Sequence, residues 1–261
     1  FFDKKLIAKN FSKASKHYDK SALVQKLAAE KLCNILSPFL TTKSSIIDLG
    51  SGTSSLYKSL TSQDNFCHKE YKLFELDLSL SMLKHWEGKN SKLIYPIVGD
   101  VDYLPFKTAS FDLIVSSFSL QWVHDFETIF SQFSQMLTND GILAFCIPNS
   151  LSLQEIKAAS IQSGCNFHLN DLPKISDLEE NLMKCGFKKY YLESEIIKSE
   201  FENPIQALKS LKEIGANYSG PKNFISKDKL QHFENFCLKN NTHDNKKFAI
   251  SWNISYFVFS I

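Results

Sequence analysis

The sequence predicts an α/β fold built on a doubly wound, mostly parallel sheet of seven strands, with a helical lid inserted before the last strand. Short apolar segments alternate with amphipathic ones through residues 46–147, which is the pattern of parallel strands joined by crossover helices. The strand segments are apolar throughout, as expected where helices cover both faces of a sheet. The 261 residues are 43% hydrophobic and 22% charged with a net charge of +2, a balance that excludes a disordered chain.

The chain is expected to begin with helices. Leucine and isoleucine recur near helical spacing in residues 7–36, which predicts one or two amphipathic helices, and Pro38 ends this pattern. The expected strands are residues 45–49, 71–77, 93–98, 111–116, 142–147, 189–197 and 248–261. After the first strand, the expected helices end near residue 60 and then cover 79–86, 126–137, 152–162, 176–185, 204–214 and 227–239, with a turn at 139–141.

This order of elements divides the chain into four parts. Residues 1–45 are N-terminal helices that cover the active site, residues 46–202 are the ligand-binding sheet domain, residues 203–247 are the lid and residues 248–261 are the last strand of the sheet. No run of about 18 apolar residues and no apolar signal segment occurs, so we expect no membrane association and a cytoplasmic location.

The cysteines argue against a metal centre or a disulfide framework. No C-x-x-C pair is present, and the two cysteines closest in sequence, Cys146 and Cys165, are 19 residues apart. Both kinds of site require clustered or regularly spaced cysteines. We therefore expect buried, reduced thiols and no metal.

A glycine turn follows the first expected strand. Asp48 precedes Gly50-Ser51-Gly52, but a dinucleotide fingerprint requires a third glycine at the position that Ser55 occupies. The Gly-Lys-Ser/Thr end of a P-loop is also absent. The turn therefore favours a nucleoside ligand other than a dinucleotide or a nucleoside triphosphate.

Three acids stand at or beside the ends of three successive strands: Asp48, Asp77 and Asp100. The carboxyl ends of parallel strands form the ligand-binding edge of such a sheet, where an acid after the second strand accepts hydrogen bonds from ribose hydroxyls. Asp100 is placed to accept from an adenine amino group, and an acid also suits a positively charged sulfonium or amino group. Each acid taken alone also fits a helix cap or a turn.

Four segments resemble the motifs of the class I S-adenosylmethionine-dependent methyltransferases. They are IIDLGSGT at 46–53, LDLS at 76–79 followed by Met-Leu at 82–83, GDVDYLPF at 99–106 and FDLIVSS at 111–117. The resemblance implies a Rossmann-like fold, S-adenosylmethionine as cofactor with S-adenosylhomocysteine as product, and no metal. The cofactor-binding residues that it implies are Asp48, Gly50, Ser51, Gly52, Asp77, Leu78, Asp100, Val101 and Ser116. The sequence departs from the family pattern at Ser54, where glycine is usual, and at Ser51, where cysteine is frequent.

Three further segments resemble the malonyl-acyl-carrier-protein O-methyltransferases of biotin synthesis. These are residues 8–19 together with Gln25, residues 119–122 (SLQW) and residues 208–217. The resemblance implies methyl esterification of the free carboxylate of a malonyl thioester on acyl-carrier protein, with Tyr18, Gln121 and Trp122 as catalytic residues. A related methyltransferase-like assembly factor, or a methyltransferase for another small carboxylate, is the alternative. Tyr18 and Trp122 also fit purely structural roles in the core.

The chemistry of a carboxylate acceptor agrees with the residues available. A carboxylate has a reference pKa near 4, so it is ionised at neutral pH and requires no general base. The Asn/Asp-Pro-Pro-Tyr motif of amino-group methyltransferases is absent at residues 116–119, and we expect no His–Asp pair in the site.

Charge is distributed unevenly along the chain. All 30 basic residues are lysine. Residues 1–45 carry a net charge of +6 and residues 203–247 carry +4, whereas the remainder carries −8. Basic segments on both sides of the active-site mouth suit an acidic carrier protein, although lysine-rich segments are also simply solvated surfaces. The absence of a basic stripe interleaved with aromatic residues argues against a nucleic-acid partner.

Overall fold

The computed structural model describes residues 3–40, 44–62, 71–84, 93–167, 169–214, 226–240 and 247–261. Its seven-stranded sheet has the order β3-β2-β1-β4-β5-β7-β6. The strands are β1 (Ser44–Leu49), β2 (Tyr71–Asp77), β3 (Ile94–Val98), β4 (Phe111–Ser117), β5 (Leu137–Pro148), β6 (Lys188–Phe201) and β7 (Phe248–Ser260). Strands β1 to β5 are parallel, whereas β7 runs antiparallel to both β5 and β6. The predicted Rossmann-like, doubly wound and mostly parallel sheet is confirmed.

Helices flank the sheet and follow most of the predicted ranges. Before the sheet lie α1 (Lys4–Ala14), α2 (Tyr18–Ser21), α3 (Leu23–Leu36) and the 3-10 turn η1 (Ser37–Phe39). Between the parallel strands lie α4 (Ser55–Thr61), α6 (Leu80–Lys84), the 3-10 turn η2 (Leu120–Trp122) and α7 (Phe126–Met136). The remaining helices are α8 (Gln154–Gln162), α9 (Ile175–Lys184), α10 (Pro204–Glu213) and α11 (Lys227–Asn240).

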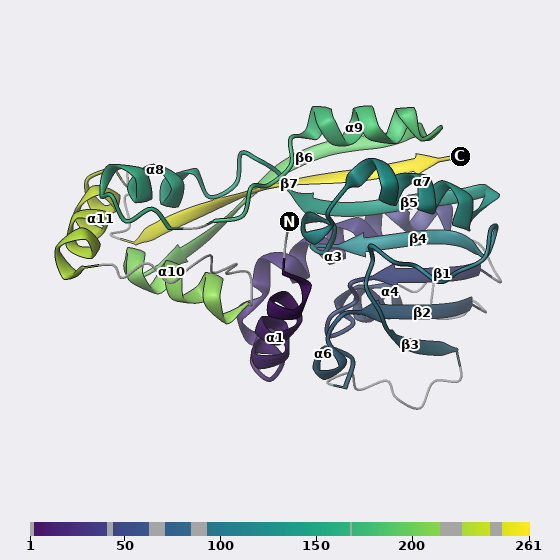
Figure 1. Cartoon of the computed structure of the whole chain (residues 1–261), viewed down its shortest axis with the longest axis horizontal. Helices are drawn as coiled ribbons and strands as arrows, with labels where there is room; N and C mark the ends of the chain where they lie inside the picture. Colours follow the sequence, from purple (N-terminus) through teal and green to yellow (C-terminus); the bar gives the residue numbers. More distant parts are fainter. Residues whose placement is uncertain are drawn as a thin grey trace.

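The two faces of the sheet carry separate hydrophobic cores, and helices lie on both faces (Figure 1). Helices α3 and α4 cover one face, and α7 and α9 cover the other. Successive side chains of a strand point to opposite faces, so Ile46 packs in the first core and Ile47 in the second, both with no solvent exposure. This double coverage explains why the central strands are apolar, whereas the edge strands β3 and β6 are largely exposed and β6 carries many charged residues.

Strands β6 and β7 extend beyond the other strands, and α8, α10 and α11 gather around the extension (Figure 1). Ile156 of α8, Ala207 of α10 and Phe233 of α11 are all buried in the core that α3 shares. Helices α10 and α11 come between β6 and β7 in the chain, as predicted for a helical insertion before the last strand. The extended part of β6 and β7, together with α8, α10 and α11, is called the projection. Helix α8 packs against α11 in it, although α8 belongs to residues 46–202, which were predicted to form the sheet domain.

Three boundaries differ from the sequence prediction. The predicted turn at 139–141 is wrong, because β5 already begins at Leu137, which pairs with Phe111; a register shift between Phe111 and Leu113 accommodates the intervening residues. The N-terminal region forms three α-helices instead of one or two. Strand β6 continues to Phe201 because β7 pairs with it along its whole length. Residues 85–86 of the predicted helix 79–86 lie outside the described residues.

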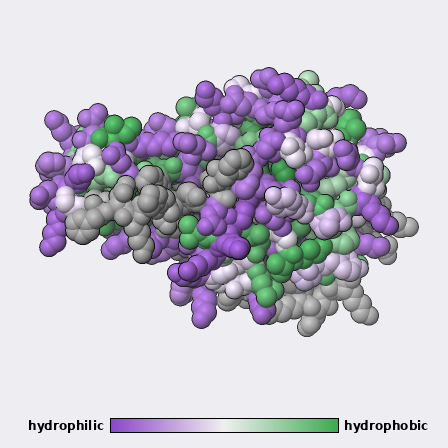
Figure 2. Space-filling model, viewed as in Figure 1, coloured by the Kyte–Doolittle hydropathy of each residue, from purple (hydrophilic) through white to green (hydrophobic). Residues whose placement is uncertain are grey.

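The surface of the projection is mainly hydrophilic, whereas a group of hydrophobic side chains lies over α6 and β3 (Figure 2). Exposed Leu80 and Val98 belong to these elements. Within the described ranges, no helix is both long enough and apolar enough to cross a membrane. The described cysteines are free, and all but Cys185 are buried; Cys67 lies outside the described residues.

Phe145 lies between two other aromatic rings of the second core. Its ring stacks on Phe257 at a centroid distance of 4.5 Å and on Phe130 at 5.9 Å, and it has no solvent exposure. Phe145→Ala should lower the free energy of unfolding by about 3–5 kcal/mol, measured by urea denaturation. The exposed Ile161→Ala is the matched control and should change it by less than about 0.5 kcal/mol. Similar effects of the two changes would contradict this description of the core.

Candidate functional site

One cavity opens at the carboxyl ends of β1, β2, β3 and β4, where ligands bind in open α/β sheets. Helix α1 contributes one helical face to its wall. The residues that line this cavity are Lys4, Ile7, Phe11, Tyr18, Gly50, Gly52, Asp77, Leu78, Met82, Gly99, Asp100, Val101, Ser117, Phe118, Ser119, Trp122 and Val123.

The glycine turn after β1 forms the floor of the cavity. Gly50 and Gly52 have φ values of +74° and +58°, and Ser54 also adopts the left-handed conformation at +63°. Left-handed backbone is free of strain only for glycine. The backbone N–H groups of Gly50 and Ser51 both donate to Leu76 O, at 2.7 and 3.0 Å, so the end of β2 fixes the turn.

Asp77 joins the glycine turn to the end of β2. The N–H of Gly52 donates to Asp77 Oδ2 (2.9 Å), and the N–H of Ser79 donates to Asp77 Oδ1 (2.7 Å). Burial raises the pKa of Asp77 to about 6, although these two hydrogen bonds act to lower it. The carboxylate is therefore held rigidly at the cavity wall, where its remaining lone pairs can accept from a ligand.

A second layer of buried acids lies behind the turn. Asp48 and Glu75 are register partners on β1 and β2, and each is 1% exposed. Burial, with Glu75 as the next cause, raises the pKa of Asp48 well above its ordinary value. Among the described residues, neither carboxylate oxygen of Asp48 has a hydrogen-bond partner, nor has the buried hydroxyl of Ser51. Unsatisfied buried acceptors of this kind are expected where a positively charged ligand or a water molecule completes the site.

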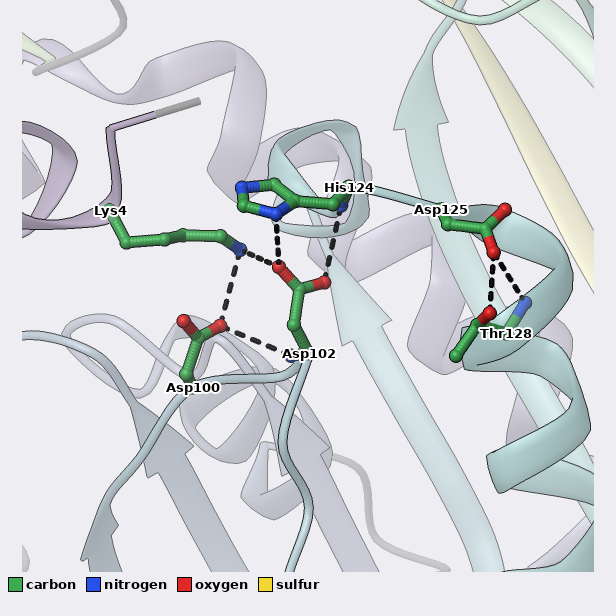
Figure 3. Close-up of polar contacts among 6 residues, drawn as sticks. All are labelled: Lys4, Asp100, Asp102, His124, Asp125 and Thr128. Carbon is green, nitrogen blue, oxygen red and sulfur yellow. Dashed lines mark hydrogen bonds and ion pairs between the residues drawn. The ribbon is translucent and has the colours of Figure 1, made fainter. Parts of the chain in front are cut away.

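Asp100 and Lys4 close the end of the cavity next to β3 (Figure 3). Lys4 Nζ lies 3.2 Å from Asp100 Oδ1 and 2.7 Å from Asp102 Oδ2. His124 also meets Asp102, through its backbone N–H (3.2 Å) and through Nδ1 at 3.6 Å. The structure thus contains a His–Asp pair that sequence analysis did not expect, but neither of its members lines the cavity.

Tyr18 also lines the cavity, beside the helix α2 that it begins. Its neighbour Asp19 accepts a hydrogen bond from the Thr53 hydroxyl and pairs with Lys58 at 3.0 Å, which fixes α2 on the glycine turn. This docking explains why the N-terminal helices are interrupted at α2. Burial, then Asp77 and Asp19, raise the pKa of Tyr18. The phenol therefore stays protonated and can act as a hydrogen-bond donor but not as a base.

Aromatic rings continue the wall from Tyr18 across to β4. Phe11 packs edge-to-face on Tyr18 at 6.3 Å and on Trp122 at 5.9 Å between ring centroids. Ser119, at the start of η2, packs directly on the glycine turn, because a methyl group added to Gly50 would lie 1.9 Å from Ser119 Oγ. The part of the wall formed by Phe11, Tyr18, Ser119 and Trp122 therefore combines apolar rings with neutral hydroxyl groups.

Gln121 lies outside the cavity wall. Its side-chain Nε2 donates to Phe118 O at 2.9 Å. Phe118 has a φ of +53°, a conformation that costs energy for a residue with a large side chain. The geometry favours a positioning role for Gln121, which holds the turn that brings Phe118 and Ser119 to the cavity.

The structure brings most of the predicted site residues together. The predicted residues that line the cavity are Tyr18, Gly50, Gly52, Asp77, Leu78, Asp100, Val101 and Trp122. Asp48, Ser51 and Ser116 lie behind this wall, and the Ser116 hydroxyl donates to Leu49 O at 2.7 Å, which ties β4 to β1.

Lys4, Phe11 and Ser119 line the cavity but were not predicted as site residues. Phe11 stands within the N-terminal motif at residues 8–19, and Ser119 begins the SLQW motif, so both carried a signal. Lys4 carried none, because its partners lie about a hundred residues away in the sequence.

The cavity fits S-adenosylmethionine by its chemistry. That molecule presents a positively charged sulfonium, an amino group, a ribose diol and an adenine amino group, all of which suit acidic acceptors. Asp77 and Asp100 face the cavity, and the unpartnered oxygens of Asp48 lie behind the turn. Among the described residues, no group of three or more acidic, histidine or cysteine side chains is arranged to hold a metal ion.

Comparison with known families and proteins gives a consistent result. Residues 47–145 match the family model described as "Methyltransferase domain". Curated relatives named malonyl-acyl-carrier-protein O-methyltransferase are 23–29% identical to the chain. The relative of that name from Buchnera aphidicola is 29% identical over 234 residues, which cover 89% of this chain and 90% of the relative.

Solved structures share the fold. A protein from Bacillus halodurans C-125 has a TM-score of 0.64 at 15% identity, with 89% of this chain and 97% of that chain covered. Phosphoethanolamine N-methyltransferase 2 of Haemonchus contortus, solved with phosphomonomethylethanolamine and S-adenosylhomocysteine, has a TM-score of 0.54 at 17% identity. That match covers 88% of this chain and 52% of the other. At these identities the likeness establishes the fold alone.

The two glycines of the turn allow a matched test of the cavity floor. A Cβ at Gly50 collides with Ser119, whereas a Cβ at Gly52 meets nothing within 4 Å. Gly52→Ala should therefore cost only the left-handed strain, about 1–2 kcal/mol of stability. Gly50→Ala should additionally displace Ser119 and weaken S-adenosylhomocysteine binding more strongly, as measured by calorimetry. Equal losses of affinity would exclude a special role for the contact between Gly50 and Ser119.

The raised pKa of Asp77 predicts a pH dependence of ligand affinity. Hydroxyl donors require the ionised carboxylate, so binding below pH 6 must remove a proton from Asp77, whose pKa is about 6. Affinity for S-adenosylhomocysteine should fall by up to about ten-fold per pH unit below 6 and level off above it. The pKa values of Asp48 and Glu75 are also raised, so either acid could cause a similar pH dependence. Asp77→Asn is the control that separates them. This variant should bind more weakly and lose most of the pH dependence; an unaltered profile would assign the titration to the other acids.

Proposed function

We propose that the chain is a class I S-adenosylmethionine-dependent methyltransferase that methyl-esterifies the free carboxylate of a malonyl thioester carried on acyl-carrier protein, an early step of biotin synthesis. The relatives named malonyl-acyl-carrier-protein O-methyltransferase support this choice of substrate over most of the chain. A cytoplasmic location and the division into N-terminal cover, cofactor domain and lid are parts of the same proposal.

The observation that carries the proposal is the set of titratable side chains that line the cavity. The described ones are Lys4, Tyr18, Asp77 and Asp100, and no histidine is among them. Asp77 and Asp100 suit the cofactor, and the rest of the wall offers neutral hydroxyls and aromatic rings. Such a site can align an acceptor that is already ionised, whereas a neutral hydroxyl or amine acceptor would require a base.

The mechanism follows from these residues. When bound, S-adenosylmethionine supplies an electrophilic methyl group on a positively charged sulfur. Asp77 and the glycine turn hold the cofactor at the strand ends, and Tyr18 donates a hydrogen bond that orients the acceptor carboxylate. Trp122 and Phe11 exclude water from the reacting end. Alignment and desolvation of two well-placed reactants can lower a barrier by about 7–11 kcal/mol without proton transfer.

The test is turnover with a chemically matched control. The protein should transfer a methyl group to malonyl-acyl-carrier protein, detected as the methyl ester by mass spectrometry. It should transfer none to the same thioester when its carboxylate is already esterified. Binding of S-adenosylhomocysteine without turnover on malonyl thioesters would favour the alternatives, an assembly-factor-like protein or a methyltransferase for another small carboxylate. Rescue of a biotin-auxotrophic bacterium that lacks its own methyltransferase is the corresponding test in cells.

The carrier proposal predicts a role for lysines of α10. Lys209 and Lys212 are exposed on this helix, whose end contacts α2 through the hydrogen bond from the Ser21 hydroxyl to Glu213 (3.2 Å). Lys222, Lys227 and Lys229 of the predicted lid are expected near the same mouth; Lys222 lies outside the described residues, and Lys227 and Lys229 are exposed on α11. Replacing Lys209 and Lys212 by Glu should raise the KM for malonyl-acyl-carrier protein in a salt-dependent way. The KM for a small malonyl thioester should stay nearly unchanged. Equal losses on both substrates would instead indicate a structural role for α10.

A further inference from the structure

Helix α1 spans the mouth of the cavity and contacts three strand ends. Its residues Lys4, Ile7 and Phe11 lie on one helical face and all line the cavity. The Ser12 hydroxyl shares a hydrogen bond with Ser79 after β2 (2.8 Å), and Phe11 packs on Trp122 after β4. Lys4, at the first turn of the helix, makes the remaining attachment, to Asp100 and Asp102 after β3.

The hydrogen bonds of Asp100 leave one oxygen for a ligand. Asp100 Oδ1 accepts both from Lys4 Nζ (3.2 Å) and from the backbone N–H of Asp102 (3.1 Å). Asp100 Oδ2 makes no hydrogen bond within the described part of the chain, and it points away from Lys4 (Figure 3). Lys4 therefore does not compete for the oxygen that an adenine amino group would use. It fixes the rotamer of the carboxylate that offers that oxygen.

The two neighbouring carboxylates of Asp100 and Asp102 require a nearby cation. The carboxylates of Asp100 and Asp102 lie close enough to share the Lys4 ammonium, and their side chains are only 17% and 8% exposed. Two carboxylates so near each other and so poorly hydrated repel, and a shared ammonium offsets the repulsion. The neighbouring Lys5 and Lys9 are exposed on α1, and neither lines the cavity.

We propose that Lys4 is a positioning residue that couples closure of α1 over the cavity to recognition of the adenine amino group by Asp100. The proposal rests on the cofactor assigned under the proposed function, but not on the acceptor. In the closed form, the Lys4 ion pairs hold Asp100 ready for the adenine and hold Ile7 and Phe11 against the ligand. The ligand leaves only after the first turn of α1 detaches from Asp100 and Asp102, so the ion pairs lengthen its residence time.

The experiment measures S-adenosylhomocysteine dissociation from the full chain by stopped-flow competition. Lys4→Met, which keeps most of the side-chain volume and removes the charge, should raise the dissociation rate about ten-fold, the size expected for losing one charge-assisted contact. The association rate should not fall, because detachment of the first turn of α1 opens the entry path as well as the exit path. Lys5→Met is the matched control on the same helical turn and should leave both rates unchanged. Lys4→Arg keeps the charge, but its planar fork can engage both oxygens of Asp100, so it should not restore slow dissociation.

Asp102→Asn provides an independent arm. Asp102 does not line the cavity, so this variant removes a partner of Lys4 without touching the ligand site. It should accelerate dissociation less than Lys4→Met, which also loses the Asp100 contact, and the double variant should be no faster than Lys4→Met alone, because that change already breaks the contact with Asp102. Additive effects of the two changes, or an unchanged dissociation rate in Lys4→Met, would overturn the proposal.

Hydrogen exchange of α1 separates this proposal from the proposed function. In the protein without ligand, Lys4→Met should increase amide exchange in α1 relative to Lys5→Met, because an attachment of the helix is lost. S-adenosylhomocysteine should protect α1 in the native chain and much less in Lys4→Met, as linkage between closure and binding requires. If the protein shows both effects but does not methylate malonyl thioesters, the proposed acceptor is wrong and the coupling through Lys4 still holds. Absence of both effects would refute the coupling whatever the acceptor.

Discussion

The close approach of the turn after β1 to the ends of β2 and β4 is the constraint on which the site depends. Gly50 lies so near Ser119 that no side chain fits between them, and the Gly50 and Ser51 N–H groups are both fixed on Leu76 O. This geometry brings Asp77 to the N–H of Gly52 and leaves a cavity directly above the turn. Helix α2 docks on this turn through Thr53 and Asp19, and residues of α1 line the cavity above it.

The sheet and the acids of the site could be predicted from the sequence because their signals are local. Buried parallel strands are apolar throughout, and a ligand-binding edge forms wherever such strands end, so Asp77 and Asp100 are placed by the strand that precedes each. Asp48 follows the same logic only in part. It stands one residue before the end of β1, and the alternation of side chains along the strand buries it behind the glycine turn instead of exposing it in the cavity.

The remaining features depend on contacts between distant parts of the chain, which no local pattern encodes. The early start of β5 follows from the pairing of Leu137 with Phe111, and the break between α1 and α3 follows from the docking of Asp19 on Thr53. Gln121 belongs to a motif that suggests catalysis, yet its amide serves the backbone of Phe118. A motif therefore identifies a functional turn more reliably than it identifies which side chain of that turn meets the ligand.

The lack of arginine gives the ion pairs at Lys4 their form. An arginine would present a planar fork that matches one carboxylate in a bidentate pair, whereas a lysine ammonium is a compact charge with three donors. At Lys4 the ammonium is divided between Asp100 and Asp102, which stand on the same loop after β3. A bidentate pair with Asp100 would engage both of its oxygens and leave none for an adenine. The divided pair engages only Oδ1, so in this arginine-free chain the ion pair that closes the helix also leaves the ligand-binding oxygen available.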